Sequence, residues 1–416
     1  MKNILIIILL TAIIGCNQPE KKYSKNPLFA GTASSNINPE IGMFIAGDKQ
    51  NRRFTGIHDS IYVKAVVIND GLSSLAIVTL DCIGLLYPDV QKIRAKASSM
   101  VTEIDLAAER IIVTSNHIHS GPDVVGIWGA NQLESGVDSV YMNKLILTAA
   151  TQVQKAANSM VHVNAYYALG EFGNEWVHNI SEPGEIDKSL TVMQFVDKHG
   201  DNVASLTNFA CHPTFFDAVH DKVSADYVGA FYKSMSNKIS GEHLFLQGAI
   251  GGWVQPDKGD QSFQIGIQRG NELAAAVIEM LDKTEPLDST NIRFKNLTFD
   301  LPVTNPGWQQ LSDMGVIKRK IGKTTPTEIA WFGIGPAQFI THPGETPPAY
   351  SFASKSWMNS EPKFVIGLGL DAMGYILKPS FFEDPKMPHA EYLTRMSPGK
   401  EAGPLVLDNI KKIIVE

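Results

Sequence analysis

Short apolar runs rich in β-branched residues alternate with amphipathic helical patterns along most of the chain. The runs predict strands at residues 61–68, 75–79, 110–114, 191–195, 204–210, 244–246 and 292–299. A repeat close to 3.6 residues predicts helices at residues 87–101, 139–157, 225–238, 265–282 and 404–413. This alternation predicts an α/β fold with mixed sheets and flanking helices, in which at least part of each sheet is parallel.

The chain has 416 residues, which is long enough to bury a large core in one large domain or two intimate lobes. Its formal net charge is -7, and it contains no long run of one charge sign. An electrostatic grip on nucleic acid requires a clustered basic face. We therefore expect no nucleic-acid partner.

The first residues combine a basic start at Lys2 with an apolar run that ends in Gly15-Cys16. This pattern predicts a signal peptide at residues 1–15 and resembles a bacterial lipobox, in which Cys16 receives the lipid. A transmembrane anchor is the weaker alternative, because about 12 apolar residues fall short of the roughly 20 that span a bilayer. We expect a lipid anchor and polar tether at residues 16–28, a domain at residues 29–416, and a place in the cell envelope on the periplasmic or cell-surface side.

Two cysteines remain after Cys16, and each lies in or beside an apolar run. One potential pair does not make a disulfide framework. We therefore predict that Cys82 and Cys211 are buried free thiols.

A predicted strand at residues 110–115 runs into a His-x-His pattern at His117 and His119. In an extended chain, residues two apart point to the same side, so both rings would face one site. Two imidazoles on one side suit a metal, or a metal ligand with an acid–base partner. The alternative is a pair of hydrogen-bonded surface histidines.

Two further strand ends carry polar groups or a glycine-rich turn. The apolar run at residues 206–211 ends in His212-Pro213, which is either a second ligand or a histidine at the edge of the core. A glycine-rich turn that includes Gly251 follows the run at residues 244–246. Such a turn is either a plain turn or a set of backbone N–H groups aimed at an anionic centre.

Glu345 follows a Pro-Gly turn after an apolar stretch, and Tyr375 follows a glycine. Taken alone, such a glutamate is usually solvated and such a tyrosine usually packs in the core. Open α/β sheets, however, place their binding crevices where strands end. The clustering of candidate residues at strand ends therefore predicts a site at that edge.

The order of these motifs resembles the neutral/alkaline non-lysosomal ceramidase family over roughly residues 29–416. The stretch from His117 to Pro122 is similar to the H-T-H-S-G-P signature of that family. The stretch from Asn208 to Thr214 is similar to its second histidine motif, Ser224-Ala225-Asp226 to its S-A-D segment, and Pro343-Gly344-Glu345 to its P-G-E motif.

The resemblance implies one zinc ion and a hydrolase of an amide or ester bond in a small-molecule substrate. The implied zinc ligands are His117, His212, Glu345 and Tyr375. It also implies that His119 faces the substrate as a donor or proton shuttle, and that Tyr392 is a second active-site tyrosine. Backbone donors near Gly251 would stabilise the oxyanion.

The chain departs from the family at residues that handle the substrate. The stretch from Gly251 to Pro256 lacks the serine of the family's G-D-V-S-P-N loop, and Asn179-Ile180 lacks the arginine of its N-R pair. We also do not expect the family's immunoglobulin-like domain. The resemblance therefore does not extend to ceramide as substrate, and the alternative is a non-catalytic surface binding lipoprotein that retains the pocket.

Overall fold

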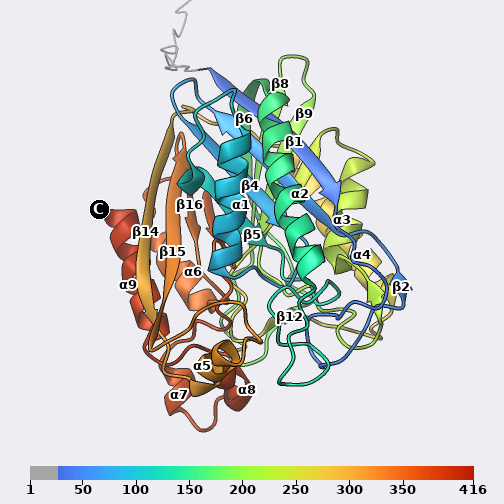
Figure 1. Cartoon of the computed structure of the whole chain (residues 1–416). Helices are drawn as coiled ribbons and strands as arrows, with labels where there is room; N and C mark the ends of the chain where they lie inside the picture. Colours follow the sequence, from blue (N-terminus) through green and yellow to red (C-terminus); the bar gives the residue numbers. More distant parts are fainter. Residues whose placement is uncertain (1–26) are drawn as a thin grey trace, which may run out of the picture.

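The computed structural model describes residues 27–416, in which two sheets are flanked by helices (Figure 1). The larger sheet contains β1 (Leu28–Asn36), β3 (Tyr62–Asn69), β4 (Ser74–Leu80), β5 (Ile111–Ser115), β6 (Val161–Glu171), β8 (Ser189–Asp197), β9 (Asn202–Phe209), β11 (Glu242–Gln247) and β13 (Glu285–Pro286). The smaller sheet contains β14 (Ile292–Pro302), β15 (Thr324–Ile334), β16 (Ala337–Thr341) and β17 (Lys363–Ile366). Two short pairs join β2 (Gly56–Ile57) to β10 (Lys222–Val223), and β7 (Val177–Asn179) to β12 (Val254–Pro256).

Both sheets are mixed, as the sequence predicts. The larger sheet has the order β11-β9-β8-β6-β1-β3-β4-β5, with β13 beside β6. Its β4–β5 and β9–β11 pairs are parallel and its other pairs are antiparallel. The smaller sheet is antiparallel except for the parallel β16–β17 pair. The predicted α/β class with mixed sheets and flanking helices is therefore confirmed.

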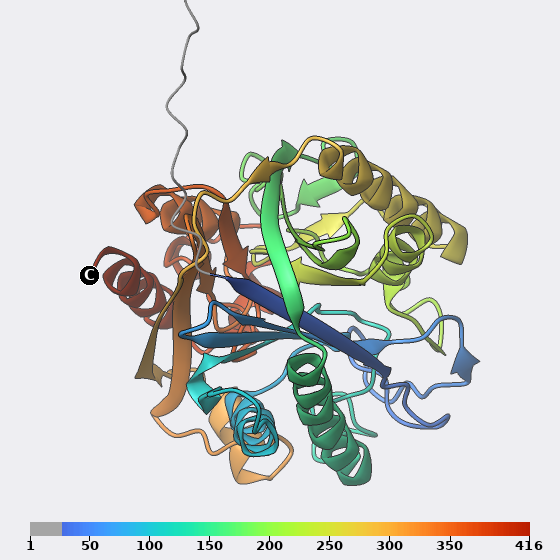
Figure 2. The ribbon, with the colours of Figure 1, turned by 90° about the horizontal axis from the view of Figure 1, so that it is seen from above.

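Helices cover the larger sheet on two sides. Figure 2 shows α1 (Tyr87–Met100) and α2 (Ser139–Asn158) on one side, with α3 (Asp226–Ser236) and α4 (Phe263–Leu281) on the other. The smaller sheet packs against α9 (Ala402–Val415) and, at β17, against α6 (Pro348–Trp357). Amphipathic spacing explains why the helices pack against the sheets. In α1, for example, the buried residues Val90, Ile93 and Ala97 lie on one face of the helix.

The two flanks of the larger sheet enclose two clusters of buried apolar side chains. One runs from the α1–α2 side to the smaller sheet and includes Ile77, Ile93 and Phe339. The other lies between α3–α4 and strands β8, β9 and β11, and includes Phe209 and Phe245. Burying apolar surface of this kind is the main favourable term in folding.

Cys82 and Cys211 are both buried and unpaired, as predicted. Within residues 27–416, no helix has both the length and the apolar character required to cross a membrane. Cys16, the signal peptide and most of the tether lie outside the described residues.

The larger sheet curls so that the carboxyl ends of distant strands meet. β5 and β11 lie at opposite ends of the strand order, yet they contact each other. The buried amide of Gln247, at the end of β11, donates to the carbonyls of Asn116 and Cys211, which follow β5 and β9. This one side chain therefore ties together the two segments that carry the predicted histidine ligands.

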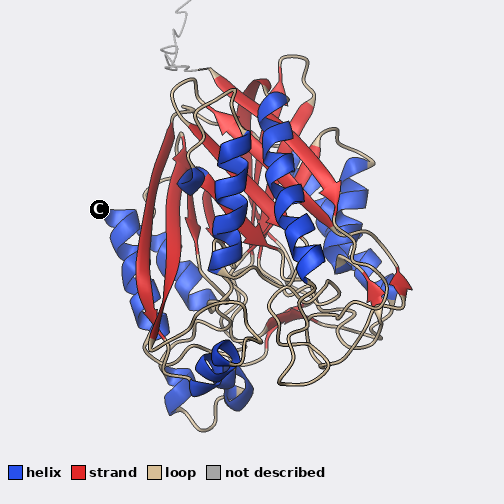
Figure 3. Cartoon of the chain, viewed as in Figure 1, coloured by secondary structure: helices blue, strands red, loops and turns tan. Residues whose placement is uncertain are grey.

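The smaller sheet joins the larger one at the same place. Asn208 of β9 accepts a hydrogen bond from the Val365 N–H and donates to the Val365 carbonyl of β17. Loops gather at this end of the sheets in Figure 3, together with α5 (Pro306–Asp313), α7 (Ser380–Glu383) and α8 (Ala390–Arg395). The first described residues lie at the opposite end (Figure 1).

Candidate metal centre

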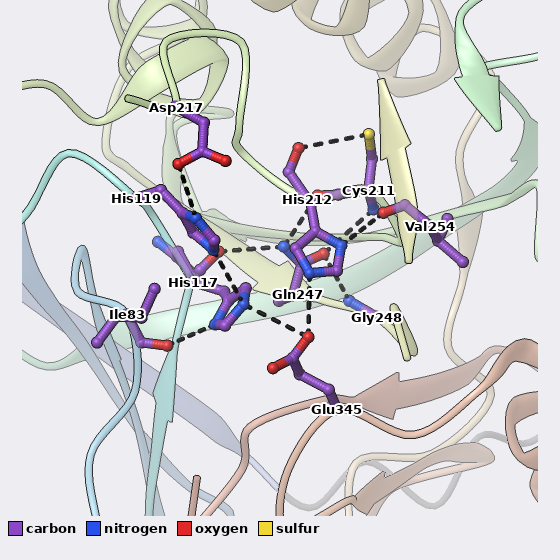
Figure 4. A network of polar contacts seen from close by, with 11 residues as sticks. Ile83, His117, His119, Cys211, His212, Asp217, Gln247, Gly248, Val254 and Glu345 are labelled. Atoms are coloured by element: carbon purple, nitrogen blue, oxygen red, sulfur yellow. Dashed lines mark hydrogen bonds and ion pairs between the residues drawn. The ribbon is translucent and has the colours of Figure 1, made fainter. Parts of the chain in front are cut away.

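Three histidines and a glutamate from three separate strand ends converge at the loop-covered end of the sheets (Figure 4). His117, His119 and His212 each place a ring nitrogen within 4.8 Å of the others, and this group could hold a metal ion. Glu345 Oε2 lies 3.0 Å from His212 Nε2 and 3.5 Å from His117 Nε2. The predicted residues are thus brought together although as many as 228 positions separate them (345 − 117).

His117 reaches the site through a turn rather than through an extended chain. β5 ends at Ser115, and His117 has a left-handed backbone with φ of 66°. Its N–H donates to Cys82 O, and its Nδ1 lies 2.5 Å from Ile83 O. The prediction that both histidines face one site is confirmed, but its reason was wrong, because no strand continues through them. Unusual backbone angles of this kind often occur at functional sites.

His212 is held just beyond β9 and is fully buried. Its backbone N–H and its Nδ1 both bond to the carbonyl of Val254, at 3.0 and 2.6 Å. A carbonyl can only accept, so Nδ1 of both His117 and His212 carries a proton, and in the neutral form of such a ring Nε2 carries none. Both Nε2 atoms therefore present a lone pair to the site, as in histidines that bind metals.

Glu345 and Tyr375 are adjacent because their segments form a parallel β-bridge. The Glu345 N–H donates to Gly374 O, and the Ile376 N–H donates to Glu345 O. Gly344 permits this approach, since a Cβ atom there would lie 2.6 Å from Gly374 O. Backbone pairing therefore places both predicted ligands on one side of the site.

Gly251 does not supply the predicted oxyanion donor. Its N–H already donates to Thr346 O at 2.8 Å, so it is not free to bond a substrate. The glycine has a packing role instead, because a Cβ atom there would lie 2.3 Å from Glu345 O. Gly251 therefore sets the position of the Glu345 backbone.

Gly251→Ala should weaken metal binding by about tenfold or more, as changes behind a metal ligand commonly do. The new methyl group would clash with the Glu345 carbonyl oxygen and so must displace the backbone of this predicted ligand. Titration of zinc against a chromogenic chelator measures the affinity. Gly184→Ala is the matched control, because a Cβ atom at Gly184 meets nothing within 4 Å. Equal zinc affinities in the two variants would contradict this role of Gly251.

The electrostatics of the site favour a bound cation. Burial lowers the pKa of His117 to about 3, so the ring is neutral near pH 7. Burial alone would raise the pKa of Glu345, but the neighbouring histidines hold it below its usual value, so this group is a carboxylate. Burial, and then the charge of Glu345, raise the pKa of the Tyr375 phenol well above its usual value. A bound metal ion would counter that effect and would favour the phenolate of Tyr375.

The spacing of the donor atoms also fits a metal ion. Four ligands at 2.0–2.1 Å from a tetrahedral zinc ion lie about 3.3 Å from one another. The distances of 3.0 and 3.5 Å from Glu345 Oε2 to the two Nε2 atoms match this value. The residues present therefore fit the cofactor that the motifs imply.

His119 lies at the edge of this group and is partly exposed. Its Nε2 is 3.3 Å from His117 Nε2, and its Nδ1 is 3.3 Å from Asp217 Oδ1. The second oxygen of Asp217 lies 3.5 Å from Lys258 Nζ. Motif comparison missed Asp217, and its signal in the sequence was only a carboxylate five residues after His212.

Tyr392 lies at the mouth of the site. Its ring stacks on Trp253 with the centroids 5.3 Å apart, and it lies 6.3 Å from the ring of Tyr375. Burial raises the pKa of Tyr392 to about 12, so its hydroxyl is protonated near pH 7. The hydroxyl is thus a potential donor beside the predicted ligands.

A small pocket of about 60 Å³ is lined by His117, His119, Glu345, Tyr375 and Tyr392. A groove of about 620 Å³ adjoins the pocket. The pocket and the groove share six lining residues, namely Asp48, Ile127, Trp128, Trp308, Tyr392 and Met396. Trp128 and Trp308 could not be predicted as lining residues, because a tryptophan in a loop or at the start of a helix is common in protein cores.

Comparison with known proteins identifies similarity to neutral ceramidase in sequence and in fold. No protein-family model matches the chain. Over 250 residues, the chain is 20% identical to the neutral ceramidase of Pseudomonas aeruginosa, covering 56% of this chain and 36% of that protein. The matched region thus spans about a third of the length of the curated relative.

Two solved structures share the fold. The crystal structure of neutral ceramidase from Pseudomonas aeruginosa has a TM-score of 0.76 at 16% identity, over 94% of this chain and 74% of that one. A ceramidase complexed with C2 has a TM-score of 0.72 at 15% identity, with the same coverage. The resemblance predicted from the motifs is therefore confirmed at the level of the fold, which this chain shares with neutral ceramidase.

Proposed function

We propose that the chain is a zinc-dependent hydrolase that cleaves an amide or ester bond in a small-molecule substrate. The observation that carries this proposal is the buried meeting of three acceptor atoms, Nε2 of His117, Nε2 of His212 and Oε2 of Glu345. Acceptors at 3.0–3.5 Å without a proton between them repel one another, and a cation among them removes that repulsion.

Zinc is the metal that this donor set favours. Imidazole nitrogen together with carboxylate and phenol oxygen forms a set of donors of borderline hardness, which suits zinc. Magnesium and calcium instead prefer oxygen ligands alone. We assign the ligands as His117, His212, Glu345 and Tyr375. The ceramidase fold supports a hydrolytic use of the metal.

The residues around the metal supply the proton transfers. When held by His117, His212, Glu345 and Tyr375, zinc would supply Lewis acidity for a substrate carbonyl and for water. His119 Nε2 faces the ligands, where it accepts a proton from water and returns it to the leaving amine or alcohol. The protonated Tyr392 hydroxyl donates to the developing oxyanion in place of the Gly251 N–H, which is already bonded.

The groove supports an amphipathic substrate. Trp128, Trp308 and Met314 offer apolar surface, while Gln50 and Arg395 are polar residues that line the same groove. The small pocket suits the scissile bond, and the groove suits an apolar part with polar groups at its end. Because the serine and arginine of the family motifs are absent, we do not assign ceramide as the substrate.

A panel of N-acyl amides and acyl esters, assayed before and after zinc removal, tests the proposal. We expect turnover that a chelator abolishes and that one equivalent of zinc restores. The alternative is a surface binding lipoprotein that retains the pocket without turnover. Saturable binding of panel members, with no zinc-dependent hydrolysis of any of them, would favour that alternative.

We also propose that Cys16 is lipidated and that the protein is anchored in the bacterial cell envelope, on the periplasmic or cell-surface side. The motivation is the apolar run that ends in Gly15-Cys16. Cys16→Ala should leave the signal peptide uncleaved or move the protein from the membrane fraction to the soluble fraction. Membrane fractionation and intact mass measure this. Unchanged fractionation together with an unchanged mature N-terminus would exclude lipidation.

A further inference from the structure

Asp217 lies behind His119, on the side away from the metal ligands. Figure 4 shows His119 between Asp217 and His117. Nδ1 of His119 is 3.3 Å from the Asp217 carboxylate, and Nε2 is 3.3 Å from His117 Nε2. The two nitrogens of this one ring therefore face different groups, a carboxylate outside the site and the metal ligands inside it.

We propose that Asp217 is a positioning residue that holds His119 in the Nδ1–H tautomer, with the Nε2 lone pair directed into the site. A carboxylate can only accept, so the ring nitrogen that faces it carries the proton. The other nitrogen is then free to take a proton from water, and catalytic histidines commonly rely on such a carboxylate for orientation. The proposal rests on the hydrolase function proposed above.

The surroundings of His119 allow little freedom for another arrangement. Gly47 lies against the ring, and a Cβ atom there would be 2.7 Å from His119 Nδ1. Lys258 Nζ lies 3.5 Å from the second oxygen of Asp217. Asp217 and Lys258 are both largely buried, with 17% and 26% of their side chains exposed. A glycine and a paired carboxylate thus both adjoin Nδ1 of the ring.

Lys258 comes from the loop that departs from the ceramidase motif. This loop begins at Gly251, lacks the serine of the family, and also supplies the Val254 carbonyl that bonds His212 Nδ1. The loop therefore supports two histidines from behind. We assign Lys258 as the residue that keeps the Asp217 carboxylate turned toward His119.

Asp217→Asn, tested in the zinc-loaded full chain, distinguishes the positioning of His119 from a role of Asp217 in metal binding. We expect kcat to fall by about 10–100-fold, while KM and the zinc affinity stay within about twofold. Nitrogen-15 NMR of the imidazole rings should show the Nδ1–H tautomer of His119 in the parent protein and loss of that tautomer in the variant. Lys258→Met should shift the tautomer in the same direction and lower kcat less.

Asp300→Asn and Lys283→Met are the matched controls, since both side chains are exposed and distant from the site in sequence. An unchanged His119 tautomer or an unchanged kcat in Asp217→Asn would overturn the proposal. Loss of zinc affinity in parallel with kcat would also overturn it, because Asp217 would then support a metal ligand rather than a proton shuttle. If no substrate is turned over by the parent protein, the hydrolase proposal fails, while the NMR result still decides the role of Asp217.

Discussion

His117→Ala/His212→Ala should leave a folded protein that binds no zinc. Its rate of substrate hydrolysis should fall by a factor on the order of 10³ or more. The two Nε2 atoms are half of the proposed ligand set, and the variant retains only Glu345 and Tyr375 of the four ligands that a structural zinc site requires. Without the ion, nothing acidifies water at the site, so the largest contribution to the rate is lost. Metal analysis of the parent protein should find about one zinc per chain.

His199→Ala is the control for this experiment, because His199 is an exposed residue in the turn between β8 and β9. Its zinc content and activity should equal those of the parent protein. Circular dichroism checks that the double variant is folded. A folded double variant that retained a full equivalent of zinc would refute the ligand assignment.

Asp371→Ala should lower the free energy of unfolding by about 3–5 kcal/mol, which is the usual cost of leaving one partner of a buried ion pair without the other. Arg319 Nη1 lies 2.7 and 2.9 Å from the two oxygens of Asp371, and the two side chains are 2% and 0% exposed. Asp371 also accepts hydrogen bonds from the Tyr87 N–H and the Thr327 hydroxyl. The substitution leaves a buried guanidinium without its counter-ion.

Urea unfolding measures this loss, and Lys92→Ala is its control. Lys92 is 60% exposed and pairs with Asp89 at the surface of α1, so its loss should cost about 1 kcal/mol or less. Arg319→Met/Asp371→Leu should recover most of the stability that Asp371→Ala loses, because it leaves no unpaired charge. A loss no larger for Asp371→Ala than for Lys92→Ala would contradict the buried-pair argument.

The helices were predictable because their signals are local. α1 and α2 have continuous apolar stripes, and their predicted ends lie within one residue of the observed ones. β6 was not predicted, since most of its residues are partly or fully exposed and its apolar alternation is incomplete. β15 was also missed. It contains Pro326 and a buried charge at Glu328, which a sequence pattern counts against a strand.

Glu328 is tolerated inside the protein only because a distant residue pairs with it. Arg94 of α1 contacts its carboxylate at 2.8 Å, with both side chains almost fully buried. The partners are 234 positions apart. A pattern within a short window contains no information about such a pairing, so the strand could not be predicted.

The amino-acid sequence alone determined the fold class and the position of candidate polar residues at strand ends and glycine turns, whereas the family resemblance implied which of them form one ligand set. These signals are local, because a strand end or a glycine turn is recognised from residues adjacent in the chain. Only the tertiary structure decided that the Gly251 N–H is bonded to Thr346 and that Asp217 lies behind His119. Both facts depend on how segments about one hundred residues apart pack against each other, because a hydrogen-bonding group takes whichever partner packing brings within reach.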